Sequence, residues 1–136
     1  MCMDKEHLEQ CWISLILRIA MGLLFGVAAL AKFMMGLGTT ANFITGMFKE
    51  TWLPSALVVP YAYALPFAEA LIAVWLLTGI KLRAGWIFTA FVLVSLAFGV
   101  VVTKQPTAAD NYIYVAIACM GLYFSRYDQC VLGGKK

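Results

Sequence analysis

The stretch from Ile13 to Met34, ISLILRIAMGLLFGVAALAKFM, constrains the fold of this chain most, because it is apolar apart from Arg18 and Lys32. The hydrocarbon core of a bilayer is about 30 Å thick and needs about 20 helical residues, each rising roughly 1.5 Å. Lipid offers no hydrogen bonds to backbone groups, so such a segment crosses it as a helix. We therefore predict a first membrane span over residues 12–34, with Lys32 extending its stem toward the far interface, at the end of the span.

The composition of the whole chain supports a membrane protein. Of 136 residues, 63% are hydrophobic and 12% are charged, whereas soluble domains have about 45–50% apolar and about 25% charged residues. We expect one membrane domain over residues 1–136. No basic run with interleaved aromatics accompanies the net charge of +3, which argues against nucleic acid as a partner. The first apolar run exceeds the roughly 7–15 residues of a signal peptide, so we expect it to be retained.

Three further apolar segments predict spans over residues 58–80, 84–103 and 111–131. Pro66 lies inside the second of them and should kink it. The apolar run of the fourth, residues 111–125, is only about 15 residues long, so it needs the residues up to 131 or a locally thinner bilayer to cross. Residues 40–52 are too few to span, but their apolar side chains recur at helical spacing. They predict an amphipathic helix at the interface, either an ordinary loop helix or a lid over the bundle.

The predicted fold is therefore all-α: an integral membrane antiparallel bundle of four transmembrane helices, with a short amphipathic helix between spans one and two. Small residues suited to close helix packing are Gly22, Gly26, Ser95 and Gly99. The tryptophans expected to face lipid at the interfaces are Trp12, Trp52, Trp75 and Trp86.

Four spans would place both termini on one side of the membrane. That side would carry Lys5, Arg18, Lys81, Arg83, Arg126, Lys135 and Lys136, against Lys32, Lys49 and Lys104 on the other. The positive-inside rule then predicts that both termini are cytoplasmic.

Glu69 is the most notable polar residue, because it falls near the middle of the span 58–80. A charge at that depth costs about 2.5–3.5 kcal/mol on insertion scales, so it should face protein or water and have a partner. One hypothesis is a proton relay, or a hydrogen bond to a quinone oxygen. The alternative, which we favour, is a structural clamp between helices. The partners considered for that clamp are Arg18, Tyr63, Thr89 and Ser95.

Arg18 completes this candidate intramembrane polar site, but the two residues differ in depth. Arg18 would lie about 9 Å inside the cytoplasmic interface and Glu69 about 16 Å inside it. Side chains also lean toward the N-terminus of their own helix, which directs these two apart. A water or hydroxyl bridge would relieve the mismatch, or Arg18 alone would reach the lipid phosphates.

Metal and haem sites find little support in the sequence. His7 is the only histidine and lies outside the predicted spans, which excludes a bis-histidine haem within one chain. Cys2, His7, Cys11 and Cys130 fit no standard zinc spacing, and a disulfide is disfavoured in the cytosol. We expect no metal and no covalently bound cofactor, and Cys119 is expected to be a core residue.

Four segments together resemble the DoxX family of small four-helix membrane proteins, over roughly residues 12–132. They are LRIAMGLLFGVAALAKF, ANFITGMFKETWLP, PFAEALIAVWLLTGIKLRAG and NYIYVAIACMGLYFSRYDQCVLG. One departure is Tyr123-Phe124, where that family often has Gly before its Ser-x-x-Asp ending. The resemblance implies a bundle of the bacterial inner membrane, often found beside redox enzymes. The DoxX family includes the DoxD-like small subunits of a thiosulfate:quinone oxidoreductase.

The sequence thus favours an accessory subunit, not an enzyme on its own, that docks to a larger membrane redox or energy-transducing complex. Its expected partners are lipids and other membrane subunits. A second hypothesis is a quinone-interacting subunit that uses Glu69 and Arg18, with quinone or a structural lipid as ligand. A third is a small-solute transporter, which would need more than one copy.

Overall fold

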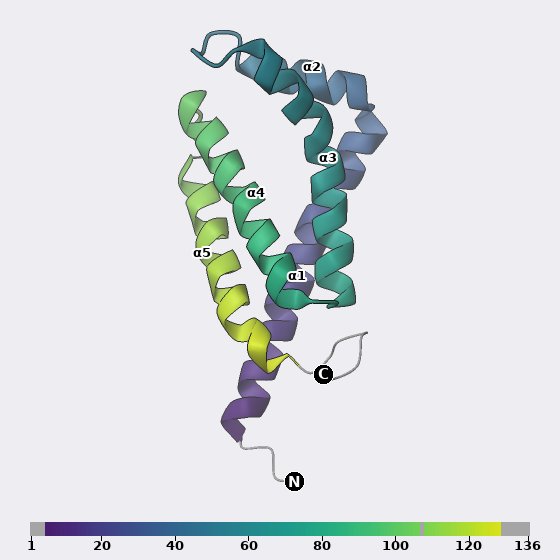
Figure 1. The fold of residues 1–136 in the computed structure, drawn as a ribbon, viewed down its shortest axis with the longest axis vertical. Helices are drawn as coiled ribbons and strands as arrows, with labels where there is room; N and C mark the ends of the chain where they lie inside the picture. The colour runs from purple at the N-terminus through teal and green to yellow at the C-terminus, as the bar shows by residue number, and fades with distance from the viewer. Residues whose placement is uncertain (1–4, 107, 129–136) are drawn as a thin grey trace.

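The computed structural model describes residues 5–106 and 108–128, and this part of the chain is helical. The helices are α1 (Lys5–Met35), α2 (Leu37–Met47), α3 (Ser55–Thr78), α4 (Leu82–Val102), α5 (Ala108–Phe124) and the 3-10 turn η1 (Ser125–Tyr127) (Figure 1). By length and composition α1, α3 and α4 can each cross a membrane. A helical, multi-pass membrane protein is thereby confirmed. The 17-residue α5 is not among these three helices, so length and composition support three spans and not four.

Four helices form a ring, in which α1 packs on α3, α3 on α4, α4 on α5, and α5 on α1. Figure 1 shows that neighbours in the ring run antiparallel. The first turn of α1, the α3–α4 turn and η1 lie at one end of the ring, which we call the terminal end. The short helix α2 crosses the opposite end, which we call the α2 end, and packs mainly against α3.

Several helix boundaries differ from those predicted. The first helix begins at Lys5 and not at residue 12, because the polar head KEHLEQ is rich in good helix formers. The predicted interfacial helix 40–52 is displaced to Leu37–Met47. It starts early because Gly36, at φ 90°, breaks the chain after α1. The fourth predicted span ends as α-helix at Phe124, not residue 131, and residues 129–131 lie outside the described residues.

The α3–α4 turn is short and closed by hydrogen bonds. Gly79 adopts φ 74°, and its N–H donates to the carbonyl of Trp75 at 3.0 Å. The indole Nε1 of Trp75 donates to the carbonyl of Ile80 at 2.6 Å. Trp75, which was expected to anchor the chain in the interface, thus also fastens this turn. At its other end α3 bends in the half that contains Pro60 and Pro66 (Figure 1), as expected where prolines leave backbone carbonyls free.

Two clusters of buried residues form the core, a smaller one beneath α2 and a larger one nearer the terminal end. Met21 and Phe25 of α1 meet Ile72 and Leu76 of α3 there, and Trp86 of α4 is fully buried. The prediction that Trp86 faces lipid is therefore wrong. Helix α5 packs directly on α4, which covers a face that would otherwise meet the membrane.

Gly121 on α5 allows this close approach of α4, because a Cβ at that position would overlap the indole ring of Trp86. We expect Gly121→Ala to lower the free energy of unfolding by about 1–3 kcal/mol, the usual cost of overpacking. A chemical-unfolding series in mild detergent measures this. Gly38→Ala is the matched control, because a methyl group there meets nothing within 4 Å. An equal loss of stability in both variants would contradict the packing explanation.

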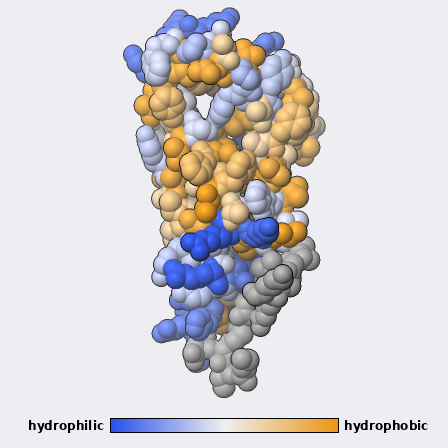
Figure 2. Space-filling model, in the orientation of Figure 1, coloured by the Kyte–Doolittle hydropathy of each residue, from blue (hydrophilic) through white to orange (hydrophobic). Residues whose placement is uncertain are grey.

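The outer surface of the helices is apolar, as a bilayer requires. Large side chains exposed on it include Ile16, Leu23, Val27, Val74, Phe91 and Val94. Apolar residues cover the middle of the face shown in Figure 2, and polar residues gather toward both ends. In water such a surface would be an aggregation liability. Trp12 and Trp52 are exposed at opposite ends of the ring.

Candidate functional site

One stripe of α1 carries the two basic side chains that pair with buried carboxylates in the described residues. Ser14, Arg18, Met21, Phe25 and Ala29 are buried and recur every three or four residues. Continuing this spacing leads to Lys32. The stripe therefore turns two basic side chains toward the inside of the ring, one at each end. Each of them meets a carboxylate.

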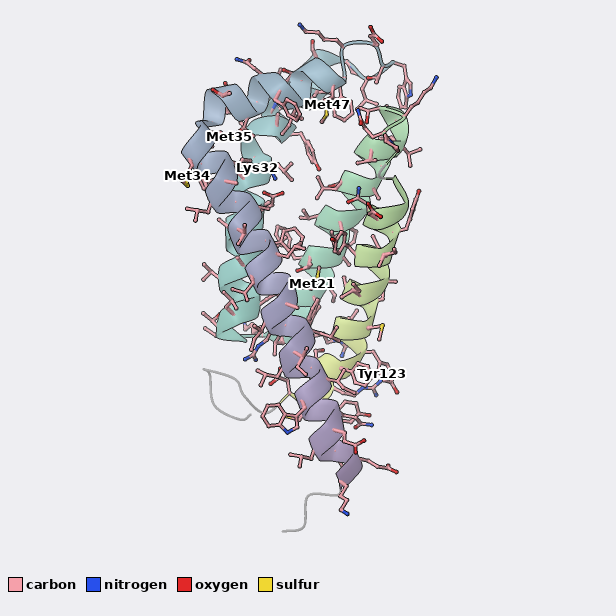
Figure 3. All side chains as sticks on the ribbon, turned by 180° about the vertical axis from the view of Figure 1, so that it is seen from behind. Met21, Lys32, Met34, Met35, Met47 and Tyr123 are labelled. Carbon is pink, nitrogen blue, oxygen red and sulfur yellow. The ribbon has the colours of Figure 1, made fainter. Side chains whose placement is uncertain are left out.

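Near the α2 end, Lys32 pairs with Glu69 of α3. Lys32 Nζ lies 2.5 Å from both carboxylate oxygens of Glu69. The Glu69 side chain is 3% exposed, whereas that of Lys32 is 24% exposed. Figure 3 shows Lys32 directed from α1 toward α3, while the neighbouring Met34 points away from the bundle. Glu69 is thus buried with its charge compensated, and Lys32 does not extend to the interface as expected.

At the terminal end, Arg18 pairs with Asp128, the last residue that the structure describes. Arg18 Nη1 donates to Asp128 Oδ2 at 3.2 Å, and the hydroxyl of Ser14 donates to the same oxygen at 3.1 Å. The side chain of Asp128 is fully buried and that of Arg18 is 7% exposed. These contacts hold Asp128, which directly follows η1, against the first helix.

Arg18 and Glu69 are therefore not brought together, since each pairs with another residue. They lie at different levels of the bundle, in agreement with the depth argument. The other clamp partners considered for Glu69 also have different contacts. Tyr63 is exposed, Thr89 donates to the carbonyl of Gly85, and the Ser95 hydroxyl shares a hydrogen bond of 2.9 Å with Tyr61.

Sequence reasoning missed Lys32 and Asp128 as partners. The signal for Lys32 was present, because it follows Arg18 and Phe25 at intervals of seven residues and so lies on the same face of the helix. Asp128 lies after the last helix, where no helical period applies. Its contact with α1 depends on where the chain goes after α5.

The small residues singled out for packing lie at helix contacts. A Cβ on Gly22 would be 2.8 Å from Leu77 of α3, and one on Gly26 would be 3.5 Å from Ala73. One on Gly99 would lie 3.2 Å from Phe48, which follows α2. Gly22 and Gly26 therefore let α1 approach α3 closely.

The described residues contain no group of three or more His, Cys, Asp and Glu side chains that could hold a metal ion. Cys11 is partly buried. Cys119 is exposed, so its expected place in the core is wrong. Cys2 and Cys130 lie outside the described residues.

A cavity of about 270 Å³ lies beneath α2, between α1, α3 and α4; we call it the α2 cavity. Residues that line it include Lys32, Phe43, Met47, Phe48, Tyr61 and Val100. Figure 2 shows the molecule hollowed between the α3 and α4 ends nearest α2, and in Figure 3 Met47 points from α2 into the space beneath it. Lys32 therefore brings a charge to a mostly apolar wall, while its partner Glu69 is not one of the lining residues.

The fold and these sites define a class: a multi-pass helical membrane protein with two buried ion pairs and an apolar cavity under a short crossing helix. Within that class, the chain belongs to the family of methylamine utilisation protein MauE, whose model matches residues 10–110. The match includes the Lys32–Glu69 pair and the whole lining of the α2 cavity, whereas Asp128 lies beyond it. No curated protein and no solved structure matches the chain.

The assignment to DoxX is therefore wrong, because the matching family is a different family of membrane proteins. The segments that suggested DoxX consist mainly of small and apolar residues. Tight helix packing in a bilayer selects such residues in many families, so their order and spacing did not distinguish these two.

Proposed function

We propose that this chain is a membrane-embedded accessory protein of methylamine utilisation that acts by binding other proteins of that system. The family match over residues 10–110 carries the proposal. It replaces the thiosulfate:quinone oxidoreductase that the DoxX resemblance suggested with a different set of partners.

The geometry of the buried charges supports a role in binding rather than catalysis. Glu69 and Asp128 each lie in an ion pair with a basic residue of α1. Charges compensated in this way hold helices together, and breaking such a pair is costly. The exposed apolar surface of α1, α3 and α4 gives membrane partners a broad area for contact.

We further propose that α5 is the fourth span of a single membrane domain over residues 1–136 in the bacterial inner membrane. Helix α5 runs beside α4 and packs on it. At roughly 1.5 Å per residue its 17 residues rise about 25 Å, which slight thinning of the bilayer would accommodate. Lys5, Lys81, Arg83 and Arg126 lie toward the terminal end, which favours cytoplasmic termini.

The test of the proposed function is removal of the protein from its host, followed by growth on methylamine. We expect loss of growth on methylamine as the nitrogen or carbon source, and normal growth on ammonium or succinate. Gentle purification of a tagged chain from methylamine-grown membranes should recover other methylamine-utilisation proteins at fixed stoichiometry. Normal growth of the deletion strain on methylamine would overturn the proposal.

A further inference from the structure

We propose that the α2 cavity is a binding site for a neutral, apolar ring compound that presents a carbonyl oxygen to Lys32. The inference does not depend on the role in methylamine utilisation, since it rests on the chemistry of the cavity wall. Three observations carry it: the hydrogen-bonding capacity of Lys32, the charge balance beside it, and the aromatic lining.

Lys32 has a donor to spare. A lysine ammonium has three N–H donors, and the two oxygens of Glu69 accept two of them. Within the described residues Lys32 Nζ has no other hydrogen-bond partner. The Lys32 side chain is 24% exposed beside a mostly apolar lining, and a charged donor in such a place forms a strong hydrogen bond with an acceptor that comes within reach. Since Lys32 lines the α2 cavity, a molecule in the cavity can supply the missing acceptor.

The charge balance favours a neutral acceptor. The charges of Lys32 and Glu69 cancel each other. An anionic head group would therefore be attracted by the Lys32 ammonium but repelled by the adjacent Glu69 carboxylate. A carbonyl oxygen accepts the third N–H without adding charge. A hydrogen bond from a charged donor is also stronger than one between neutral groups.

The shape of the cavity favours a ring. Phe43, Phe48 and Tyr61 contribute three aromatic side chains from α2, the segment after it and α3. Aromatic rings gain from offset or edge contacts with another ring beyond the burial of area. Met47, with its flexible thioether, adapts to the outline of a ligand. The volume of about 270 Å³ is close to the lower limit of about 300 Å³ for ligand pockets, so it suits a single ring with its tail in the membrane.

Decylubiquinone is a suitable probe, because it joins a carbonyl-bearing ring to an apolar tail. Decylbenzene has a ring and the same tail but no oxygen. We expect saturable binding of decylubiquinone to the full-length protein in nanodiscs, roughly tenfold tighter than decylbenzene. Quenching of tryptophan fluorescence, checked by mass spectrometry of the retained ligand, provides the readout.

Two neighbouring valines of α4 provide a matched pair of variants. Val100 lines the α2 cavity, whereas Val101 is exposed on the outside of the helix. Val100→Phe should fill the cavity and weaken decylubiquinone binding at least tenfold, while Val101→Phe should bind as the parent does. Leu96→Phe, at another lining position, repeats the test if Val100→Phe fails to fold.

The role of Lys32 is tested in a variant without a stranded charge. Lys32→Met together with Glu69→Leu removes the pair as a unit, which a fold tolerates better than removal of one member. We expect this double variant to bind decylubiquinone only as weakly as decylbenzene. Equal binding by the Val100 and Val101 variants, equal affinity for the two probes, or unchanged binding in the double variant would each overturn the proposal.

Discussion

Lys32→Met is expected to lower the free energy of unfolding by about 3 kcal/mol, because it strands the Glu69 carboxylate inside the membrane domain. The side chain of Glu69 is only 3% exposed and no longer has a cation beside it in this variant. Tryptophan fluorescence during a titration from mild detergent into denaturing detergent measures the change.

The double variant Lys32→Met with Glu69→Leu is the control for this prediction. It should recover most of the lost stability, since two apolar side chains replace a compensated pair at a similar depth. A double variant as unstable as the single one would contradict the clamp. If the stable double variant still supports growth on methylamine, Glu69 acts as a structural clamp. If it is stable but inactive, the Lys32–Glu69 pair has a role beyond the clamp, as the proposed hydrogen bond from Lys32 to a ligand requires.

Arg18→Met is expected to cost about 3–5 kcal/mol, because the fully buried carboxylate of Asp128 loses its ion pair. Asp128 should then be held less firmly against α1, because the Ser14 hydroxyl is a neutral donor and does not replace the lost charge. The two measurements are unfolding in detergent and the rate of limited proteolysis after Tyr127.

Arg83→Met serves as the matched control for Arg18→Met, because Arg83 is an exposed arginine near the same end of the ring. It should leave both stability and proteolysis unchanged. A joint change of Arg18→Met with Asp128→Leu should restore stability but not the position of the segment. Protection from protease in Arg18→Met would show that Asp128 does not depend on Arg18.

That the chain is a helical membrane protein was predictable from the sequence, because this depends on the length and average hydropathy of whole segments. Residues 12–34, 58–80 and 84–103 are long and apolar, and nothing but a helix satisfies their backbone groups in lipid. The structure has helices over nearly all of these ranges, although α3 ends at Thr78 and α4 at Val102. Their boundaries were less predictable: α1 extends to Lys5 because helix propensity acts beyond the membrane, where hydropathy gives no signal.

The family was not predictable from the same residues. Motifs made of small and apolar side chains report how helices pack, and unrelated membrane bundles share that requirement. Trp86 illustrates a similar limit. Its position near the start of α4 suggested an interfacial anchor, but Gly121 of α5 leaves room for its ring inside the bundle.

The sequence alone requires a partner for Glu69, because an isolated charge near the middle of the membrane is too costly to leave uncompensated, whereas it leaves open that Arg18 reaches the lipid phosphates. Only the tertiary structure decided which partners they have. The pairs Lys32–Glu69 and Arg18–Asp128 depend on how far α1 slides along α3 and on where the chain goes after α5. The position of α1 along α3 and the path of the chain after α5 depend on side-chain packing between helices, such as the close approach of Gly22 to Leu77. Helical periodicity within one segment cannot predict either of them.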